Sequence, residues 1–431
     1  MIIGTWIVGL FLFTIILKEK TSFFNLLILN IYFSILGTAI LSTRGIGSLR
    51  SFLLVTIAAI ALLVGHYLGT VRNESKSLRL KSNSNLLFHN GALDDSTVYV
   101  LVCAVALITF YHLIVGGIPI LSSRVEVARF NFNSSGLFGI PGRIFLYGVP
   151  FAWVVASANA KLKSIPWKSY NPWLIATGTL IISSISSGFK GDLFSALVLF
   201  LGAVSQFDSK RQMTFSHLIK RYQSLLFISL AYFFIVARQY RSYKLVDAPL
   251  WEQLFGRLTV SGAEPGTFLM GLSRDDYSNF SLVSDFQVLI SKYTGLVLSD
   301  RITLERFVSI KLLGWDHVTT SYFAPPVTIG IFPETMFYFG TVFAILVMLI
   351  VGFTFARLEV SNNVNTLKTT AVILLQSLLS LIVIKGAVAY HILNVLLIDC
   401  IMLIFVFILN MTLKPKASNI PNLTSNAKHL T

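Results

Sequence analysis

The sequence predicts an all-α polytopic membrane protein, and two observations support this fold class. Of the 431 residues, 55% are hydrophobic and only 12% are charged, about half the charged fraction of an ordinary soluble domain. Apolar runs of roughly 16 to 22 residues recur along the whole chain, and each can cross a hydrocarbon layer of about 30 Å as a helix. In lipid a helix is favoured because it satisfies its own backbone hydrogen bonds.

The apolar runs predict eleven transmembrane helices. The first has no positively charged leading region and no small-residue cleavage site, so we expect it to be retained. A twelfth crossing within residues 279–298 is an alternative, although Asp285 and Lys292 argue against it. The spans are expected near residues 2–17, 23–42, 51–70, 97–116, 142–158, 172–187, 191–206, 223–237, 335–356, 369–387 and 389–410.

The distribution of lysine and arginine predicts the orientation of these spans, because positive residues near span ends stay on the cytoplasmic side. One set of alternate connections carries 18 of them and the short segments of the other set carry seven. The richer set comprises 18–22, 71–96, 159–171, 207–222, 357–368 and the C-terminal tail. We therefore expect an N-terminal bundle of about eight helices (1–237), a large outward-facing loop (238–334), C-terminal spans (335–410) and a cytoplasmic tail (411–431).

Several classes of function are disfavoured by composition and motif. The two cysteines fall inside predicted spans, and the sequence has no glycine-rich phosphate loop, no HExxH and no paired CxxC, so soluble nucleotide chemistry is not expected. The net charge of +15 comes mainly from lysine and arginine in the short loops predicted to be cytoplasmic. No basic stripe predicts a nucleic-acid partner.

The outward loop is too long for a plain connection and should carry structure of its own. Residues 247–258 and 299–314 each place apolar side chains on one helical face, with Phe307 and Ile310 in the second segment. We expect both to be amphipathic helices that lie at the outer interface or cover the mouth of the bundle.

Cations in short outward segments oppose the usual charge bias and therefore need a reason. Binding an anion is the most direct one, and phosphate suits guanidinium and ammonium groups. An outward cationic pocket at the membrane edge predicts a lipid-linked phosphate or pyrophosphate. The candidate residues are Arg124, Arg129, Arg143, Lys190, Arg238 and Arg241.

Three stretches resemble the O-antigen and oligosaccharide repeat-unit polymerases of the Wzy type, which are related to the O-antigen ligases. They are SSGFKGD before an apolar span, VARQYRSYK before the large loop, and PPVTIGIFPETMFYFGTVFAILVMLIVGF. The resemblance implies a GT-C type architecture in a bacterial inner membrane. It also implies a periplasmic active site that transfers a glycan from undecaprenyl pyrophosphate onto the next lipid-linked repeat unit, without metal or cofactor.

The resemblance also implies roles for individual residues. The family's hairpin cation falls on Lys190, where lysine replaces the usual arginine, and its paired loop arginines fall on Arg238 and Arg241. Donor and acceptor would both be undecaprenyl-pyrophosphate-linked oligosaccharides, with membrane lipids and a polysaccharide chain-length regulator as further partners.

The attacking sugar hydroxyl needs a base, and three residues are candidates. His317 lies in the loop before the returning span and has a suitable pKa range. Glu334 is expected at the start of the ninth span, and Asp192 lies near the start of another. Tyr390 and His391 are expected near the outer end of their span as interfacial anchors.

Two other interpretations compete with the polymerase. An O-antigen ligase would share the topology but transfer the chain to lipid A core. A polysaccharide flippase or transporter would show internal repeats and charges deep in the spans, and the sequence shows neither clearly. A purely structural membrane partner would leave the outward cations unexplained.

Overall fold

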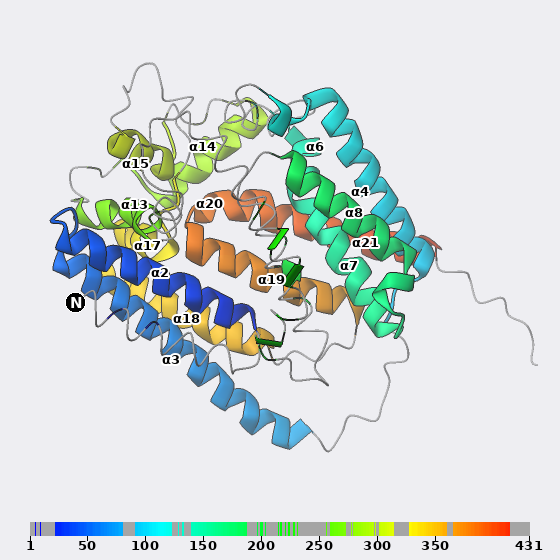
Figure 1. Ribbon diagram of the computed structural model, residues 1–431, viewed down its shortest axis with the longest axis horizontal. Helices are drawn as coiled ribbons and strands as arrows, with labels where there is room; N and C mark the ends of the chain where they lie inside the picture. The colour runs from blue at the N-terminus through cyan, green and yellow to red at the C-terminus, as the bar shows by residue number, and fades with distance from the viewer. Residues whose placement is uncertain are drawn as a thin grey trace, which may run out of the picture.

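The structure is a computed structural model of the 431-residue chain, shown in Figure 1. It describes residues 22–80, 91–122, 139–187, 259–272, 279–296, 301–313, 327–359 and 365–413, together with single residues between these ranges. The regular elements within these ranges are all helical. The predicted all-helical membrane class is therefore confirmed.

Seven helices are long and apolar enough to cross a membrane. Six of the predicted spans, from 23–42 to 142–158 and the last two, correspond to them within a few residues. The predicted span 172–187 corresponds to α8 (Asn171–Ser186), which has 16 residues. The predicted spans 2–17, 191–206 and 223–237 lie largely outside the described residues. The seven are Phe23–Thr43, Leu49–Arg72, Asp95–Leu121, Ile140–Leu162, Thr341–Glu359, Thr366–Lys385 and Val388–Leu413.

The predicted span 335–356 has the wrong start. A short helix, α17 (Ile331–Phe339), ends at Gly340, and a separate helix, α18 (Thr341–Glu359), begins directly after it. Gly340 has a φ of 88°, a left-handed conformation that breaks the helix and that glycine adopts without steric cost. Glu334 therefore belongs to the short helix and not to the start of a span.

The transmembrane helices begin and end at residues with clear local roles. Helix α2 (Phe23–Thr43) starts at Ser22, whose hydroxyl accepts from the Asn25 N–H at 3.1 Å, and α19 (Thr366–Lys385) starts at Asn365, whose side chain accepts from the Leu367 N–H. Such N-caps satisfy backbone donors that a helix leaves free. The remaining long helices are α3 (Leu49–Leu80), α4 (Asp95–Gly116), α7 (Val149–Leu162) and α21 (Leu397–Leu413).

Two of the spans contain a π-helical turn. Helix α7 is preceded by α6 (Ile140–Arg143) and the π turn η3 (Ile144–Gly148). Helix α21 is preceded by α20 (Val388–His391) and the π turn η7 (Ile392–Leu396). The two regions are in contact, since the hydroxyls of Tyr147 and Tyr390 are hydrogen-bonded at 2.8 Å. Isolated π turns inside helices are frequent at functional sites.

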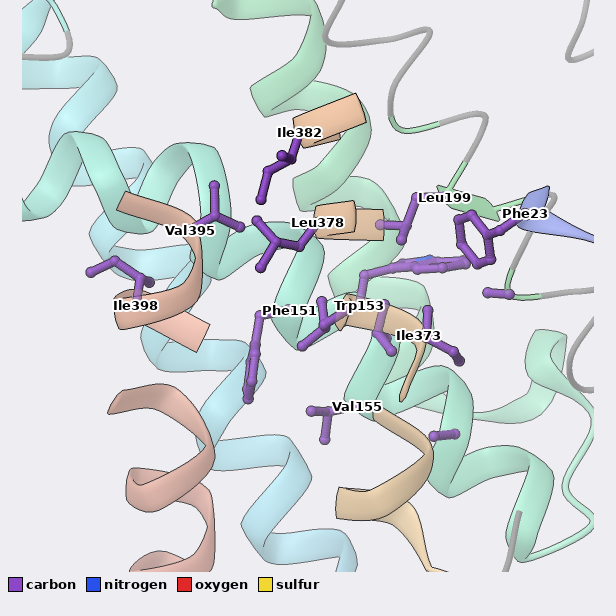
Figure 2. Packing of buried hydrophobic residues seen from close by; sticks show 14 of the residues in the cluster. Phe23, Phe151, Trp153, Val155, Leu199, Ile373, Leu378, Ile382, Val395 and Ile398 are labelled. Carbon is purple, nitrogen blue, oxygen red and sulfur yellow. The ribbon is translucent and has the colours of Figure 1, made fainter. Parts of the chain in front are cut away.

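The centre of the bundle is a close-packed apolar core between α7, α19 and α21, shown in Figure 2. Trp153 and Phe151 of α7 are fully buried there, against side chains from α19, from the π turn η7 and from α21. The labelled neighbours in Figure 2 include Ile373, Leu378, Ile382, Val395 and Ile398.

Helices α3 and α18 approach each other backbone to backbone. A Cβ atom added at Gly65 would lie 2.0 Å from the Leu349 carbonyl oxygen, and one added at Gly352 would lie 2.0 Å from that of Leu62. Glycine is therefore required on both sides of the contact. In lipid, close packing of this kind replaces the hydrophobic effect as a driving force for helix association.

The connections predicted to share one side of the membrane meet at one end of the bundle. The Asn159 side chain at the end of α7 accepts from the Leu93 N–H at 2.7 Å and from the Thr366 hydroxyl at 3.0 Å, and donates to the Tyr170 hydroxyl at 3.0 Å. Asp94 N–H donates to the Asn410 side chain. We call this group, centred on Asn159, the Asn159 hub. It joins the segments 71–96, 159–171 and 357–368 and the end of α21, as the charge pattern predicted.

The opposite end of the bundle is covered by short helices of the large loop. They are α13 (Val260–Gly271), α14 (Leu282–Thr294) and α15 (Leu304–Leu313), which lie together above α17 and the end of α2 in Figure 1. Phe307, Val308 and Leu269 form a small apolar core with residues of α17. The prediction of an amphipathic helix within 299–314 is confirmed over Leu304–Leu313, and it packs over the bundle. The predicted helix 247–258 lies outside the described residues, apart from Gly256.

Candidate functional site

The structure brings together three buried acidic side chains at the loop-covered end. Asp285, Glu305 and Glu334 each place a carboxylate oxygen within 4.8 Å of the others. They are 2%, 5% and 1% exposed, respectively. We call this group the carboxylate cluster.

Each acid of the carboxylate cluster lies in the first turn or just after the start of a different helix. Helix α14 begins after a capping box, in which the Ser281 and Ser284 side chains each accept from the other residue's backbone N–H, and Asp285 follows directly. Glu305 is the second residue of α15 and Glu334 the fourth of α17. Helix N-termini favour negative charge, so three of them partly offset the repulsion between the acids.

Asp285 links the elements of the cover to one another. Its Oδ1 accepts from the Leu304 N–H at the start of α15 at 3.2 Å, and its Oδ2 accepts from the Tyr338 hydroxyl of α17. Tyr338 is itself 4% exposed. One carboxylate therefore ties α14, α15 and α17 together.

Glu334 lies where two interrupted helices meet. Its Oε1 accepts from the Val388 N–H at 3.1 Å, and Val388 is the first residue of α20. The chain before α17 is joined to the end of α19 by the hydrogen bond from Ile329 N–H to the Lys385 carbonyl. Gly386, with a φ of 69°, approaches Glu334 closely, since a Cβ there would lie 2.7 Å from Oε2.

One oxygen of the carboxylate cluster has no hydrogen-bond partner. Glu334 Oε2 is fully buried and unpartnered, and so is the Ser309 hydroxyl. Ser309 lies one turn after Glu305 on α15, and residues four apart share a helix face. An unsatisfied buried polar atom costs about 1–3 kcal/mol, so each calls for an explanation.

Burial governs the protonation of the carboxylate cluster. Desolvation raises the pKa of Asp285 to about 7, with a further contribution from the charge of Glu305. Burial likewise raises the pKa of Glu305, against the opposing effect of hydrogen bonds and of the nearby Arg306 charge. The pKa of Glu334 is raised well above its usual value by burial and then by Glu305. Without a bound cation, burial therefore favours the protonated form of all three acids.

A small cavity borders the first turn of α17. It has a volume of about 70 Å³, is lined by Gly330 to Pro333, and is also walled by Asn30 and Ser34 of α2 and Thr267 of α13. The Thr267 hydroxyl is buried and has no hydrogen-bond partner. The volume corresponds to about two water molecules, so the cavity suits a very small polar ligand.

The described part of the predicted site also lies at this end of the bundle. Arg143 is half-buried directly before the π turn that holds Tyr147, and Tyr147 contacts Tyr390. Lys385 is exposed at the end of α19, next to the bend that Glu334 contacts. Of the cations named from the sequence, the structure thus places Arg143 on the same side as Glu334.

Lys190, Arg124, Arg129, Arg238 and Arg241 lie outside the described residues, and so do the candidate bases His317 and Asp192. Glu334 is described, but it is buried among other acids and not exposed at a span end. The expectation that His391 is an interfacial anchor is wrong, because it is 4% exposed and its Nδ1 has no hydrogen-bond partner.

Asp285, Glu305 and Tyr338 were not predicted from the sequence. Each acid stands in the first turn of a helix, where it has an ordinary explanation as a partner of the helix dipole. The signal that could have found them is the retention of an acid within a short, otherwise apolar helix, as in LVSDFQVLI and IFPETMFYF.

The comparisons with known proteins identify no relative. No family model matches the sequence, and neither a curated protein nor a solved structure is significantly similar to the chain.

Proposed function

We propose that the protein polymerises undecaprenyl-pyrophosphate-linked oligosaccharide repeat units at the periplasmic face of a bacterial inner membrane. In this reaction a hydroxyl of one lipid-linked unit attacks the anomeric carbon of the growing glycan. The bond from that carbon to the pyrophosphate breaks, and the polyprenyl pyrophosphate leaves as an anion.

One observation carries the proposal: the covered end of the bundle holds cations together with three buried acids. Arg143 and Lys385 lie there with the carboxylate cluster, beneath the helices of the large loop. Cations suit the leaving pyrophosphate, since preorganised charges at a developing anion contribute about 3 kcal/mol each. Lys190, Arg238 and Arg241 would add to them if the resemblance to the Wzy-type polymerases holds.

Glu334 is one candidate for the base. The other two, His317 and Asp192, lie outside the described residues. Burial favours the neutral form of Glu334, so this side chain must lose its proton before it can accept one from the sugar hydroxyl. Its burial means that a sugar hydroxyl can reach it only after α13–α15 shift away from α17. The cover therefore has to move during the reaction. Substitution of Glu334, His317 and Asp192 one at a time identifies the base.

The test is deletion of the gene in its native strain, followed by gel analysis of the surface polysaccharide. A polymerase predicts acceptors that carry a single repeat unit and no ladder. Arg143→Ala, produced at the wild-type protein level, should reduce the yield of polymerised chains by about tenfold or more. Arg44→Ala is the matched control, because Arg44 is exposed in the turn between α2 and α3 at the same end.

A transporter is the second candidate, and one observation favours it. Two interrupted helices meet at Glu334, and paired helix breaks around a charged residue are typical of secondary transporters. A transporter or an O-antigen ligase would be indicated if deletion removed all attached repeat units. A full-length ladder in the deletion strain would contradict all three.

A further inference from the structure

The carboxylate cluster places three acidic side chains together in the protein interior, where even a single acid is rarely fully buried without a partner. Three carboxylates from α14, α15 and α17 converge, each at most 5% exposed. Acids placed this closely cannot all ionise unless a positive charge joins them. The choice is therefore between shared protons and a bound cation.

The unpartnered oxygens favour a cation. Neither Glu334 Oε2 nor the Ser309 hydroxyl, which lies on the Glu305 face of α15, makes a hydrogen bond. Both side chains are more than nine-tenths buried. Buried oxygens that receive no hydrogen bond are groups that a hard metal ion can coordinate.

The spacing and the donor type point to one class of ion. The donors are all oxygens, which suits Mg²⁺, Ca²⁺ and Mn²⁺ over softer metals. Their separation of no more than 4.8 Å lies below the about 5.2 Å that can separate opposite ligands of one Ca²⁺ ion, so a single ion can contact all three carboxylates. Mg²⁺ keeps several of its waters, whereas a nearly closed site requires an ion that releases them.

We propose that Asp285, Glu305 and Glu334 bind a divalent cation, Ca²⁺ by preference, which fastens the loop helices α14 and α15 to α17. The ion replaces protons on the three carboxylates and connects elements that are otherwise joined through Asp285, Leu304 and Tyr338. Its role is to hold the cover in place. This site goes beyond the proposed polymerase function and does not depend on it; where Glu334 acts as the base, the ion must first leave and release the cover.

The test uses the full chain, purified in detergent and treated with EDTA. Addition of CaCl₂ should raise the thermal unfolding midpoint by several degrees, and MgCl₂ at the same concentration should raise it less. Isothermal titration should show binding to the wild-type protein. Asp285→Asn or Glu334→Gln should weaken this binding by about tenfold or more, because ligand charge sets the affinity of such sites.

The matched control is Glu264→Gln, because Glu264 lies on α13 in the same cover, is partly exposed and is not a member of the carboxylate cluster. This variant should keep the full response to CaCl₂. The proposal is overturned if CaCl₂ and MgCl₂ both leave the wild-type midpoint unchanged, or if Asp285→Asn and Glu334→Gln respond like wild type. An equal effect of the two ions would overturn the preference for Ca²⁺. The assay contains no lipid-linked sugar, so its outcome is separate from that of the ladder experiment.

Discussion

The two ends of the bundle differ in how their buried polar side chains are hydrogen-bonded. Both bury polar side chains between helices that are far apart in the sequence. In the Asn159 hub, one amide makes hydrogen bonds to Leu93, Tyr170 and Thr366, and the neighbouring Asp95 forms an ion pair with Lys163 at 2.9 Å. In the carboxylate cluster, acid meets acid and Glu334 Oε2 has no partner.

This difference in hydrogen bonding indicates that the Asn159 hub is a structural junction and that the carboxylate cluster is a candidate site. A network in which each polar group is satisfied stabilises one arrangement. An unsatisfied cluster of like charges costs stability, and proteins retain such costs mainly where function requires them. The comparison therefore predicts opposite responses when polar groups are removed at the two ends.

The largest effect is expected in the Asn159 hub. Asn159→Ala removes the partner of the Leu93 N–H and of the Thr366 hydroxyl and leaves them buried. We expect a loss of roughly 3 to 5 kcal/mol, because each orphaned group costs about 1–3 kcal/mol. Thermal unfolding in detergent measures this, with Asn171→Ala as the control, since Asn171 is exposed at the start of α8. Equal midpoints for the two variants would contradict the structural role of the hub.

The second effect has the opposite sign and depends on pH. Burial raises the pKa of Asp285 to about 7, while an unfolded aspartate titrates near 3.9. The unfolded state therefore ionises first, and the stability of the cation-free protein falls as pH rises from about 4 to 7. Asp285→Asn removes this carboxyl and should raise stability at pH 7.5 by on the order of 2 kcal/mol.

Unfolding midpoints between pH 4 and 8 in EDTA measure this second effect. Glu264→Gln again serves as the control and should keep the wild-type pH profile. If Asp285→Asn unfolds at a lower temperature than wild type at pH 7.5, the carboxylate cluster is a stabilising network and resembles the hub.

The smallest effect tests the contact between Gly386 and Glu334. Gly386→Ala places a methyl group in a left-handed backbone position and 2.7 Å from Glu334 Oε2. Gly117→Ala introduces a similar positive φ of 76° with no atom within 4 Å. Strain alone costs about 1–3 kcal/mol, so we expect Gly386→Ala to be about 1 kcal/mol worse than Gly117→Ala by thermal unfolding. A Cβ at Gly386 would also lie 3.0 Å from the Gly330 carbonyl oxygen, so equal costs would show that Glu334 and this backbone both move away freely.

The all-helical class and six of the predicted spans are confirmed, because hydropathy acts locally. Helices such as α2 and α19 follow from runs of apolar residues, and the shared side of their connections follows from lysine and arginine. The break at Gly340 was missed, because FYFGTVFAIL is apolar on both sides of the glycine and hydropathy does not register a backbone angle.

The candidate site was predictable only in part. Glu334 was named as a candidate base because it was expected at the outward start of the ninth span. Asp285 and Glu305 could not be linked to it, because the three acids belong to separate helices whose meeting is decided by tertiary packing. The three acids come close together only when the cover has folded onto α17, so no regular spacing in the sequence indicates their contact.

The close contact of α3 with α18 has a consequence for how the chain is assembled. Gly65 and Gly352 are 287 residues apart in the sequence, and synthesis at about 5–20 residues per second needs roughly 15 to 60 seconds to span that interval. Helix α3 therefore enters the membrane well before its partner has been made, with its glycine surface unoccupied. The N-terminal half of the protein must wait for residues 341–359 before its tightest helix pair can close.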